Sequence, residues 1–245
     1  MRKSSSASLS PVPTQVWGLG ATLSFSALSF ALFLMVGGGV SALSLLLTLP
    51  RTANPDQLLA SRSTVIAIAT LAAGLGGLAA IAGFILLLPG ARWRDYLNFY
   101  PPSWRSLLIW NGLLIPLLLL QGQIAQRLSQ TTDFLVEAYH QSHQTLPLLY
   151  LAVVGMAPLF EEVLFRGFMF KGIEQSRFGA PGAIALTSFC WAIVHVQYST
   201  FFMAALFLLG LFLGYARHQT KSVWVPISIH AFNNLLAMIF TVGGA

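Results

Sequence analysis

The sequence predicts an all-α protein, a polytopic bundle of transmembrane helices. Of its 245 residues, 56% are hydrophobic and only 8% are charged, and the mean hydropathy is +0.74. A soluble domain carries about 25% charged residues, so this chain lacks the polar side chains to cover a water-exposed surface. The net charge of +6 is explained by basic loops facing anionic lipid. We therefore expect a lipid bilayer as partner, and neither nucleic acid nor nucleotide.

Seven apolar stretches are candidates for membrane-spanning helices, each of which needs about 20 residues. They are residues 16–37, 64–88, 106–121, 147–171, 181–198, 200–216 and 222–242. The first stretch continues through three glycines, so 16–49 could be one tilted span or a helix followed by a re-entrant segment. Residues 91–105 mix arginines with aromatic rings and are predicted to lie at the headgroup level. We expect one integrated domain, in which 1–146 supplies spans and loops and 147–245 carries the chemistry.

The basic residues predict the orientation. With seven spans and a cytoplasmic N-terminus, nine Lys and Arg residues fall inside: Arg2, Lys3, Arg92, Arg94, Arg105, Lys171, Arg177, Arg217 and Lys221. Three fall outside: Arg51, Arg62 and Arg127. This asymmetry follows the positive-inside rule. We therefore expect a multi-pass integral membrane protein with its N-terminus in the cytoplasm and its C-terminus outside.

Charged residues cluster inside the fourth predicted span. Charges at bilayer depth cost about 2.5–3.5 kcal/mol each on insertion scales and are candidates for function. Glu162 and Arg166 are four residues apart and share a helix face, so they can form a structural ion pair. Glu161 points about 100° away and needs a partner from another helix, from water or from a metal. The competing interpretation is a single ion-pair network that only locks helices together.

Histidines on later spans extend this constellation. His195 follows Trp191 by four residues in the fifth span, and His230 and Asn234 share a face of the seventh. With Glu161 they could supply a base, a water-orienting group and donors to an oxyanion. Glu161, His195 and His230 could equally be ligands of a zinc ion, the one cofactor that we consider.

Three motifs give these residues a family resemblance. Glu-Glu-x-x-x-Arg, then aromatic-x-x-x-His, then His-x-x-x-Asn, in this order on separate spans, resembles the CAAX prenyl endoprotease and bacteriocin-processing family of intramembrane proteases. The resemblance covers roughly residues 147–242, with Trp191 where many members have phenylalanine. It implies a peptidase of the prokaryotic plasma membrane or of an organellar membrane, acting on a membrane-associated peptide or protein.

The resemblance also implies roles for the site residues. Glu161 would activate the hydrolytic water with help from His195, while His230 and Asn234 would stabilise the oxyanion. Glu162 with Arg166 would hold the helix in place. One feature fits poorly: counted at about 1.5 Å per residue, Glu161 and His230 reach similar depths in the cytoplasmic half, but His195 falls close to the far end of its span.

Two other functions compete with hydrolysis of a peptide bond near the cytoplasmic membrane face. Buried Glu and His residues also line the pathways of ion- or proton-coupled transporters. Broken helices and a repeat between the two halves would favour a transporter, and the sequence shows neither. The third possibility is a catalytically silent membrane scaffold or immunity protein, against which the complete set of motif residues argues.

Overall fold

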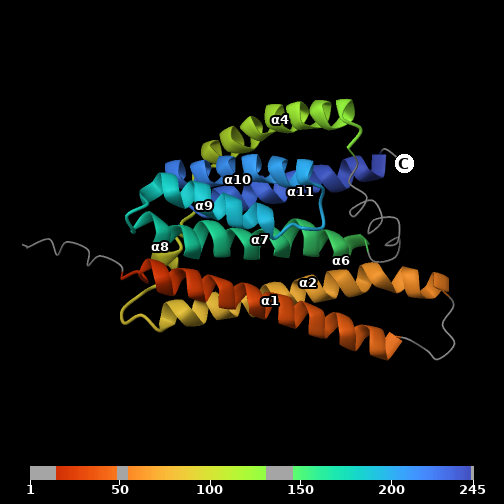
Figure 1. Cartoon of the computed structure of the whole chain (residues 1–245), viewed down its shortest axis with the longest axis horizontal. Helices are drawn as coiled ribbons and strands as arrows, with labels where there is room; N and C mark the ends of the chain where they lie inside the picture. Colours follow the sequence, from red (N-terminus) through yellow and green to blue (C-terminus); the bar gives the residue numbers. More distant parts are fainter. Residues whose placement is uncertain (1–14, 49–54, 131–145, 244–245) are drawn as a thin grey trace, which may run out of the picture.

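The computed structural model describes residues 15–48, 55–130 and 146–243. In these residues every regular element is a helix, and Figure 1 shows them as a bundle. The elements are α1 (Leu19–Thr48), α2 (Pro55–Leu86), α3 (Trp93–Tyr96), α4 (Trp104–Arg127), α6 (Leu146–Tyr150), η1 (Leu151–Met156), α7 (Ala157–Glu162), η2 (Val163–Met169), α8 (Phe170–Glu174), α9 (Gly179–Ile193), α10 (Thr200–Thr220) and α11 (Trp224–Gly243). The predicted all-α class is confirmed.

The helices are built for a bilayer. Five candidate spans in the described residues are long and apolar enough to cross one: Leu19–Ser44, Thr64–Leu86, Trp104–Arg127, Leu146–Glu174 and Thr200–Thr220. Two shorter apolar helices, Gly179–Ile193 and Trp224–Phe240, fall where the fifth and seventh spans were predicted. The chain is an integral membrane protein.

The first predicted span is one continuous helix. α1 runs for 30 residues through all three glycines without a break. One of them, Gly37, lies against α2, where an added Cβ would stand 3.3 Å from the Cβ of Ala73. The absence of a side chain at Gly37 therefore allows α1 to lie close to α2. Nothing in this helix supports the alternative of a separate re-entrant segment before Thr48.

The helices form layers around one central helix (Figure 1). α1 and α2 pack together along one side, and the continuous run from α6 to α8 lies against both. α9, α10 and α11 cover the other side of that run, and α4 packs outermost, chiefly on α11. The large buried core extends across these layers and includes Phe160, Phe168 and Trp191. Residues of the central helix can therefore meet α9 and α11 in the interior.

The central helix, Leu146–Glu174, contains two π-helical segments, η1 and η2, with the short α7 between them. π-helical turns are rare and often mark functional sites. Glycines of α2 allow this helix to approach closely. A Cβ at Gly77 would collide with the ring of Phe160, which stacks on Phe33 with centroids 4.5 Å apart. Close packing thus fixes α7, the segment that carries the paired glutamates.

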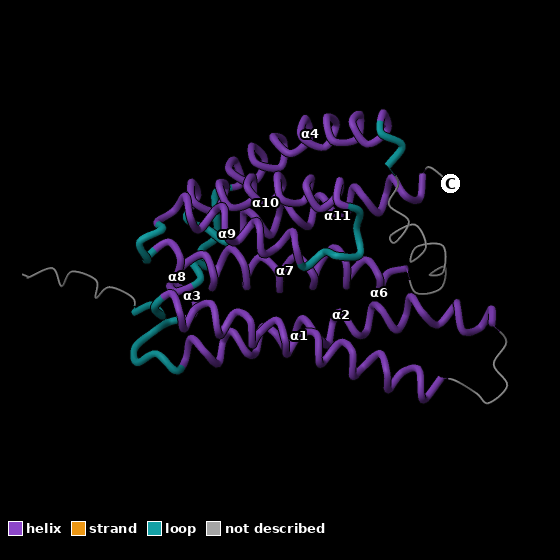
Figure 2. The backbone as a smooth tube through the Cα atoms, viewed as in Figure 1, coloured by secondary structure: helices purple, strands orange, loops and turns teal. Residues whose placement is uncertain are grey.

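α9 is shorter than the span predicted at 181–198. It has 15 residues and ends at Ile193, which at about 1.5 Å per residue makes it roughly 22 Å long, less than the bilayer core of about 30 Å. Figure 2 shows the α9–α10 connection as a loop that begins part-way along the bundle. His195 lies in this loop. The predicted mismatch in depth between His195 and Glu161 disappears, because α9 ends before it reaches the far side of the bundle and leaves His195 close to Glu161.

The segment predicted to lie at the headgroup level combines an exposed and an anchored part. Trp93 and Trp104 are exposed, at 45% and 65%, as expected of aromatic residues at an interface. Tyr96 in α3 is fully buried, and burial raises its pKa to about 12. Ser222, before α11, donates its hydroxyl to the carbonyl of Tyr100 at 2.6 Å. This segment is thereby attached to the start of α11.

Arg217 differs from its predicted position. The cation count placed it in a cytoplasmic loop, but it lies in α10 and is only 1% exposed. Its Nε donates to the backbone oxygen of Arg166 at 3.0 Å. A long side chain near a helix end can turn inward to a backbone carbonyl, so its position in the sequence did not reveal its burial.

Candidate active site

The paired glutamates have different surroundings. The side chain of Glu162 is fully buried, whereas that of Glu161 is 19% exposed. Both belong to α7, at the last turn before η2 begins at Val163. Neighbouring residues on a helix diverge by about 100°, so the two carboxylates have different surroundings, although both approach the imidazole of His230. One is enclosed in the core, while the other borders a more accessible space.

Glu162 is the centre of a buried polar network. Its Oε1 accepts from Nη1 of Arg166 at 3.0 Å and from Nδ1 of His230 at 2.9 Å. Arg166 also donates Nη2 to the backbone oxygen of Gly210 at 3.3 Å. Its guanidinium lies over the ring of Trp191, 4.8 Å from the centroid. The predicted pair is therefore part of a wider set of contacts that joins the central helix to α9, α10 and α11.

Glu161 faces both histidines. Its Oε2 lies 4.0 Å from Nε2 of His195 and 4.0 Å from Nε2 of His230. The same oxygen accepts a hydrogen bond from Nε1 of Trp191 at 2.6 Å. These side chains come from the central helix and from helices packed on it: α11 contacts α7, and α9, which leads to His195, contacts η2 and α8 (Figure 1). Three groups with acid–base capacity thus converge at one point inside the membrane protein.

His195 is positioned by the end of α9. Its Nδ1 lies 2.7 Å from the backbone oxygen of Trp191, one of the carbonyls that a helix end leaves without an intrahelical partner. A carbonyl only accepts, so Nδ1 carries the proton and donates it. Nε2 is then the nitrogen that faces Glu161. The ring satisfies the helix end and is held at a fixed orientation.

Tyr198, in the same loop, borders the site. Its ring stacks on that of His195 with centroids 6.1 Å apart, and its backbone N–H donates to the carbonyl of His195 at 3.1 Å. This loop therefore borders the imidazole that faces Glu161.

Asn234 makes a different contact. Its Nδ2 donates to the backbone oxygen of Val153 in η1 at 2.9 Å, and its Oδ1 accepts from Asn233 at 3.1 Å. It lies one turn beyond His230 on α11, as the motif spacing requires. The hydrogen bond joins α11 to the central helix. One of its two N–H donors is thereby engaged, and an amide nitrogen carries a second.

The proposed zinc ligands do not match a zinc site. Zinc bonds of about 2.0–2.2 Å in tetrahedral geometry place ligand atoms roughly 3.4 Å apart. Oε2 of Glu161 stands 4.0 Å from each imidazole Nε2 and is already bonded to an indole. Throughout the described ranges, no three His, Cys, Asp or Glu side chains are arranged to hold a metal ion. The metalloprotease interpretation is not supported, and we derive no step through a metal.

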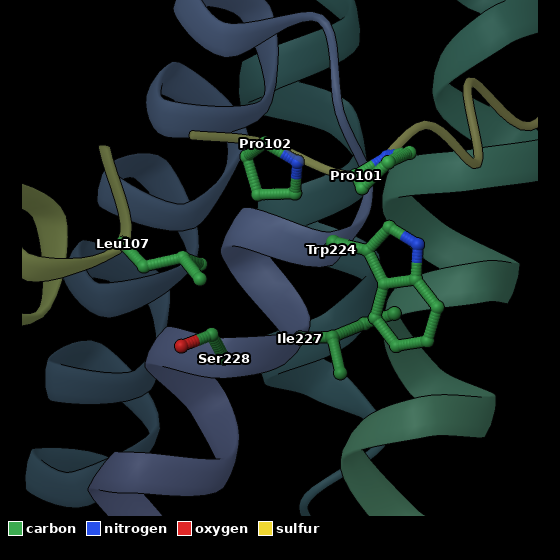
Figure 3. A pocket seen from close by; sticks show the side chains of 6 residues that line it. All are labelled: Pro101, Pro102, Leu107, Trp224, Ile227 and Ser228. Carbon is green, nitrogen blue, oxygen red and sulfur yellow. The ribbon is translucent and has the colours of Figure 1, made fainter. Parts of the chain in front are cut away.

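An apolar hollow of about 410 Å³ lies outside this site, beside α11 (Figure 3). It is lined by Pro101, Pro102, Leu107, Trp224, Ile227 and Ser228. Ser228 is two residues from His230 and so faces about 200° away from it on the helix. Its hydroxyl accepts from Asn111 of α4 at 2.8 Å. The hollow therefore belongs to the contact between α4 and α11.

Sequence reasoning missed three contributors to the site. Trp191 was noted as the motif's aromatic residue, but not as the hydrogen-bond donor to Glu161. Gly210 gave no sequence signal, although its carbonyl accepts from Arg166. Tyr198 follows His195 by three residues, a spacing that could have drawn attention to it.

These features define the class: a multi-spanning membrane protein with a carboxylate and imidazole site inside its helix bundle. Residues 143–236 match the model of the family described as Type II CAAX prenyl endopeptidase Rce1-like. The match confirms the resemblance that the three motifs predicted. The motif-bearing part of the chain is thus similar to this family, and Glu161 to Asn234 lie within the matched residues.

Two curated proteins are similar over the same length. A 97-residue stretch, 38% of this chain, is 34% identical to an "Uncharacterized 24.3 kDa protein" of Escherichia coli and covers 44% of it. A 97-residue stretch is 28% identical to the "Putative membrane peptidase YdiL" of Bacillus subtilis (strain 168), covering 39% of this chain and 38% of that protein. The similarity thus spans less than half of each relative. No solved structure matches the chain.

Proposed function

We propose that this protein is an intramembrane endopeptidase that hydrolyses a peptide bond near the cytoplasmic membrane face with water activated by glutamate and histidine. The observation that carries the proposal is the position of one oxygen, Oε2 of Glu161, 4.0 Å from Nε2 of both His195 and His230. The match of residues 143–236 to Rce1-like endopeptidases supports the reaction class.

The first step in this proposal is attack by water. The water oxygen adds to the carbonyl carbon of the substrate, and Glu161 accepts a proton from the same water. His195 orients the water through Nε2, since its Nδ1 is held by the backbone oxygen of Trp191. General-base catalysis of this kind contributes typically about 10²–10⁴-fold.

The second step is stabilisation of the tetrahedral oxyanion. His230 donates from Nε2 in its protonated form, and the buried carboxylate of Glu162 at its Nδ1 stabilises the imidazolium. Preorganised donors of this kind account for about 10²–10³ in rate each. Asn234 would contribute its second N–H, because the first is bonded to Val153.

Collapse of the intermediate completes the reaction. The C–N bond breaks, the proton held on Glu161 passes to the leaving amine, and the oxyanion returns to a carbonyl in a new carboxyl terminus. Atoms balance with one water consumed. We place the site toward the cytoplasmic side on the asymmetry of basic residues, with the N-terminus inside.

The test uses the purified full chain in proteoliposomes with two kinds of probe: a farnesylated peptide ending in a CAAX sequence, and acyl-anchored peptides of varied sequence. Mass spectrometry in ¹⁸O-water should find both products, with the label in the new carboxyl terminus. Glu161→Gln should lower the rate about 10²-fold or more. Glu174→Gln is the matched control, because Glu174 ends the same helix beside His218 and should leave the rate unchanged. Equal rates in wild type and Glu161→Gln for every probe would refute the proposal.

A further inference from the structure

We propose that Trp191 is a positioning residue that holds the Glu161 carboxylate toward both histidines. The catalytic part of this inference rests on the proposed function. The structural part, a hydrogen bond that fixes one carboxylate oxygen, stands independently of it.

The indole selects one oxygen. Nε1 of Trp191 donates to Oε2 of Glu161 at 2.6 Å, and the same atom lies 4.0 Å from the two imidazole Nε2 atoms. An indole N–H is a donor only, so it cannot take part in proton transfer. A short hydrogen bond to a charged acceptor is also stronger than a neutral one. The indole therefore aims the carboxylate without competing for its proton.

The indole is itself held on several sides. Trp191 is only 1% exposed. Its ring meets those of His195 and His230 in T-shaped contacts, both with centroids 5.2 Å apart. The guanidinium of Arg166 covers its face at 4.8 Å from the centroid. With the ring fixed in this way, the N–H direction is fixed as well. A carboxylate torsion is broad when nothing restrains it, and this contact restrains it.

One residue also positions both members of the water-activating pair. The side chain of Trp191 holds Glu161, and its backbone oxygen holds Nδ1 of His195 at 2.7 Å. The distance between base and imidazole is thus set by a single residue of α9. In addition, the face of the indole ring lies against Arg166, while its N–H edge points to Glu161. Glu161 therefore bonds to the indole, and Arg166 bonds to Glu162.

The kinetic experiment removes only the N–H. Replacement of Trp191 by β-(3-benzothienyl)alanine keeps the bicyclic shape and π face but puts sulfur in place of the N–H, and Trp191→Phe is the encoded counterpart. Loss of a hydrogen bond to a charged group predicts a kcat about 10- to 100-fold lower with KM unchanged. The benzothienyl protein should remain folded, with its melting temperature lowered by no more than the loss of one hydrogen bond predicts. Trp110→Phe, at an aromatic cluster on α4, is the control and should retain wild-type kcat.

A double mutant separates positioning from general damage. If Trp191 acts through Glu161, then Trp191→Phe should lower the rate no further in a Glu161→Gln background. The positioning role would be overturned if the rate of the double variant fell by the product of the two single-variant decreases. An unchanged kcat in the benzothienyl protein would overturn it as well.

A spectroscopic measurement tests the hydrogen bond without any activity. In protein labelled with ¹⁵N-tryptophan, the Trp191 indole proton should resonate downfield of the other indoles and shift in Glu161→Gln, but not in Glu174→Gln. If the chemical shift of the Trp191 indole proton is the same in wild type and Glu161→Gln, the inference is overturned even if the protein is a peptidase. A signal that shifts in a protein with no peptidase activity would refute the proposed function and leave the hydrogen bond established.

Discussion

Removing the charge of Glu162 should destabilise the fold rather than only the chemistry. In Glu162→Gln the guanidinium of Arg166 loses its paired negative charge, and its direct partners are then the amide oxygen at 162, the carbonyl of Gly210 at 3.3 Å and the face of Trp191. His230 loses the carboxylate at its Nδ1 as well. Both members of the ion pair are 0% exposed, so water cannot replace the missing partner.

The magnitude follows from this burial. Removal of one partner from a buried pair costs about 3–5 kcal/mol, because the other charge stays buried and uncompensated. The double variant Glu162→Gln/Arg166→Met removes both charges and places an apolar side chain of similar length beside Trp191. Replacement of a buried pair by well-packed apolar groups is often neutral or stabilising, so the double variant should recover most of the free energy of unfolding.

The assay is equilibrium unfolding of the purified protein in mixed detergent micelles, followed by circular dichroism. Glu161→Gln is the comparison: Glu161 has a side chain 19% exposed, and its amide replacement still accepts from an indole, so it should lose less than about 1 kcal/mol. A loss below about 1 kcal/mol for Glu162→Gln would refute the argument. So would a double variant no more stable than Glu162→Gln alone, or a Glu161→Gln protein that fails to fold.

Three further outcomes follow from the structure. Gly210→Ala should lose about 1–3 kcal/mol by overpacking, because its Cβ would lie 2.9 Å from that of Ser188 and 3.1 Å from Nη2 of Arg166. Gly112→Ala, inside α4 with nothing within 4 Å, should lose no stability in the same unfolding assay, because alanine is the better helix former. Burial raises the pKa of Tyr96 from 10.0 to about 12, so the free energy of unfolding should fall by about 2–3 kcal/mol as pH rises from about 10 to 12; a Tyr96→Phe protein with the same decline would contradict this. A reporter fused to the C-terminus should be active outside the cytoplasm, and cytoplasmic activity would overturn the seven-span orientation.

The sequence predicted the features that depend on local spacing. Apolar stretches near 20 residues located the helices, and the spacing of four placed Glu162 and Arg166 on one face. The length of α9 could not be predicted from local spacing. After Ile193 the sequence continues with valines on both sides of His195, so hydropathy extended the span. In the structure the chain turns there, and the imidazole of His195 donates a hydrogen bond to the end of the helix.

Contacts between helices were beyond sequence reasoning because they depend on rotation of one helix against another. Whether Trp191 faces lipid or Glu161 is decided by the packing of α9 on the central helix. The inward turn of Arg217 depends likewise on the backbone oxygen of Arg166. Asn234 was assigned by its motif, but its hydrogen bond to Val153 of η1 depends on how α11 packs on the central helix.

The two π-helical segments change how residues along the central helix should be counted. A π turn closes its hydrogen bond over five residues instead of four, so it carries one residue more than the α turn it replaces. A helical wheel drawn continuously across 146–174 therefore falls out of phase by about one residue's rotation at each segment. Glu161 and Glu162 lie between the two segments, and their directions relative to either end depend on both. A chimera that grafts this helix, or a design that idealises it, would have to preserve the two wide turns, or the carboxylates would rotate away from α9 and α11 although every motif letter stayed in place.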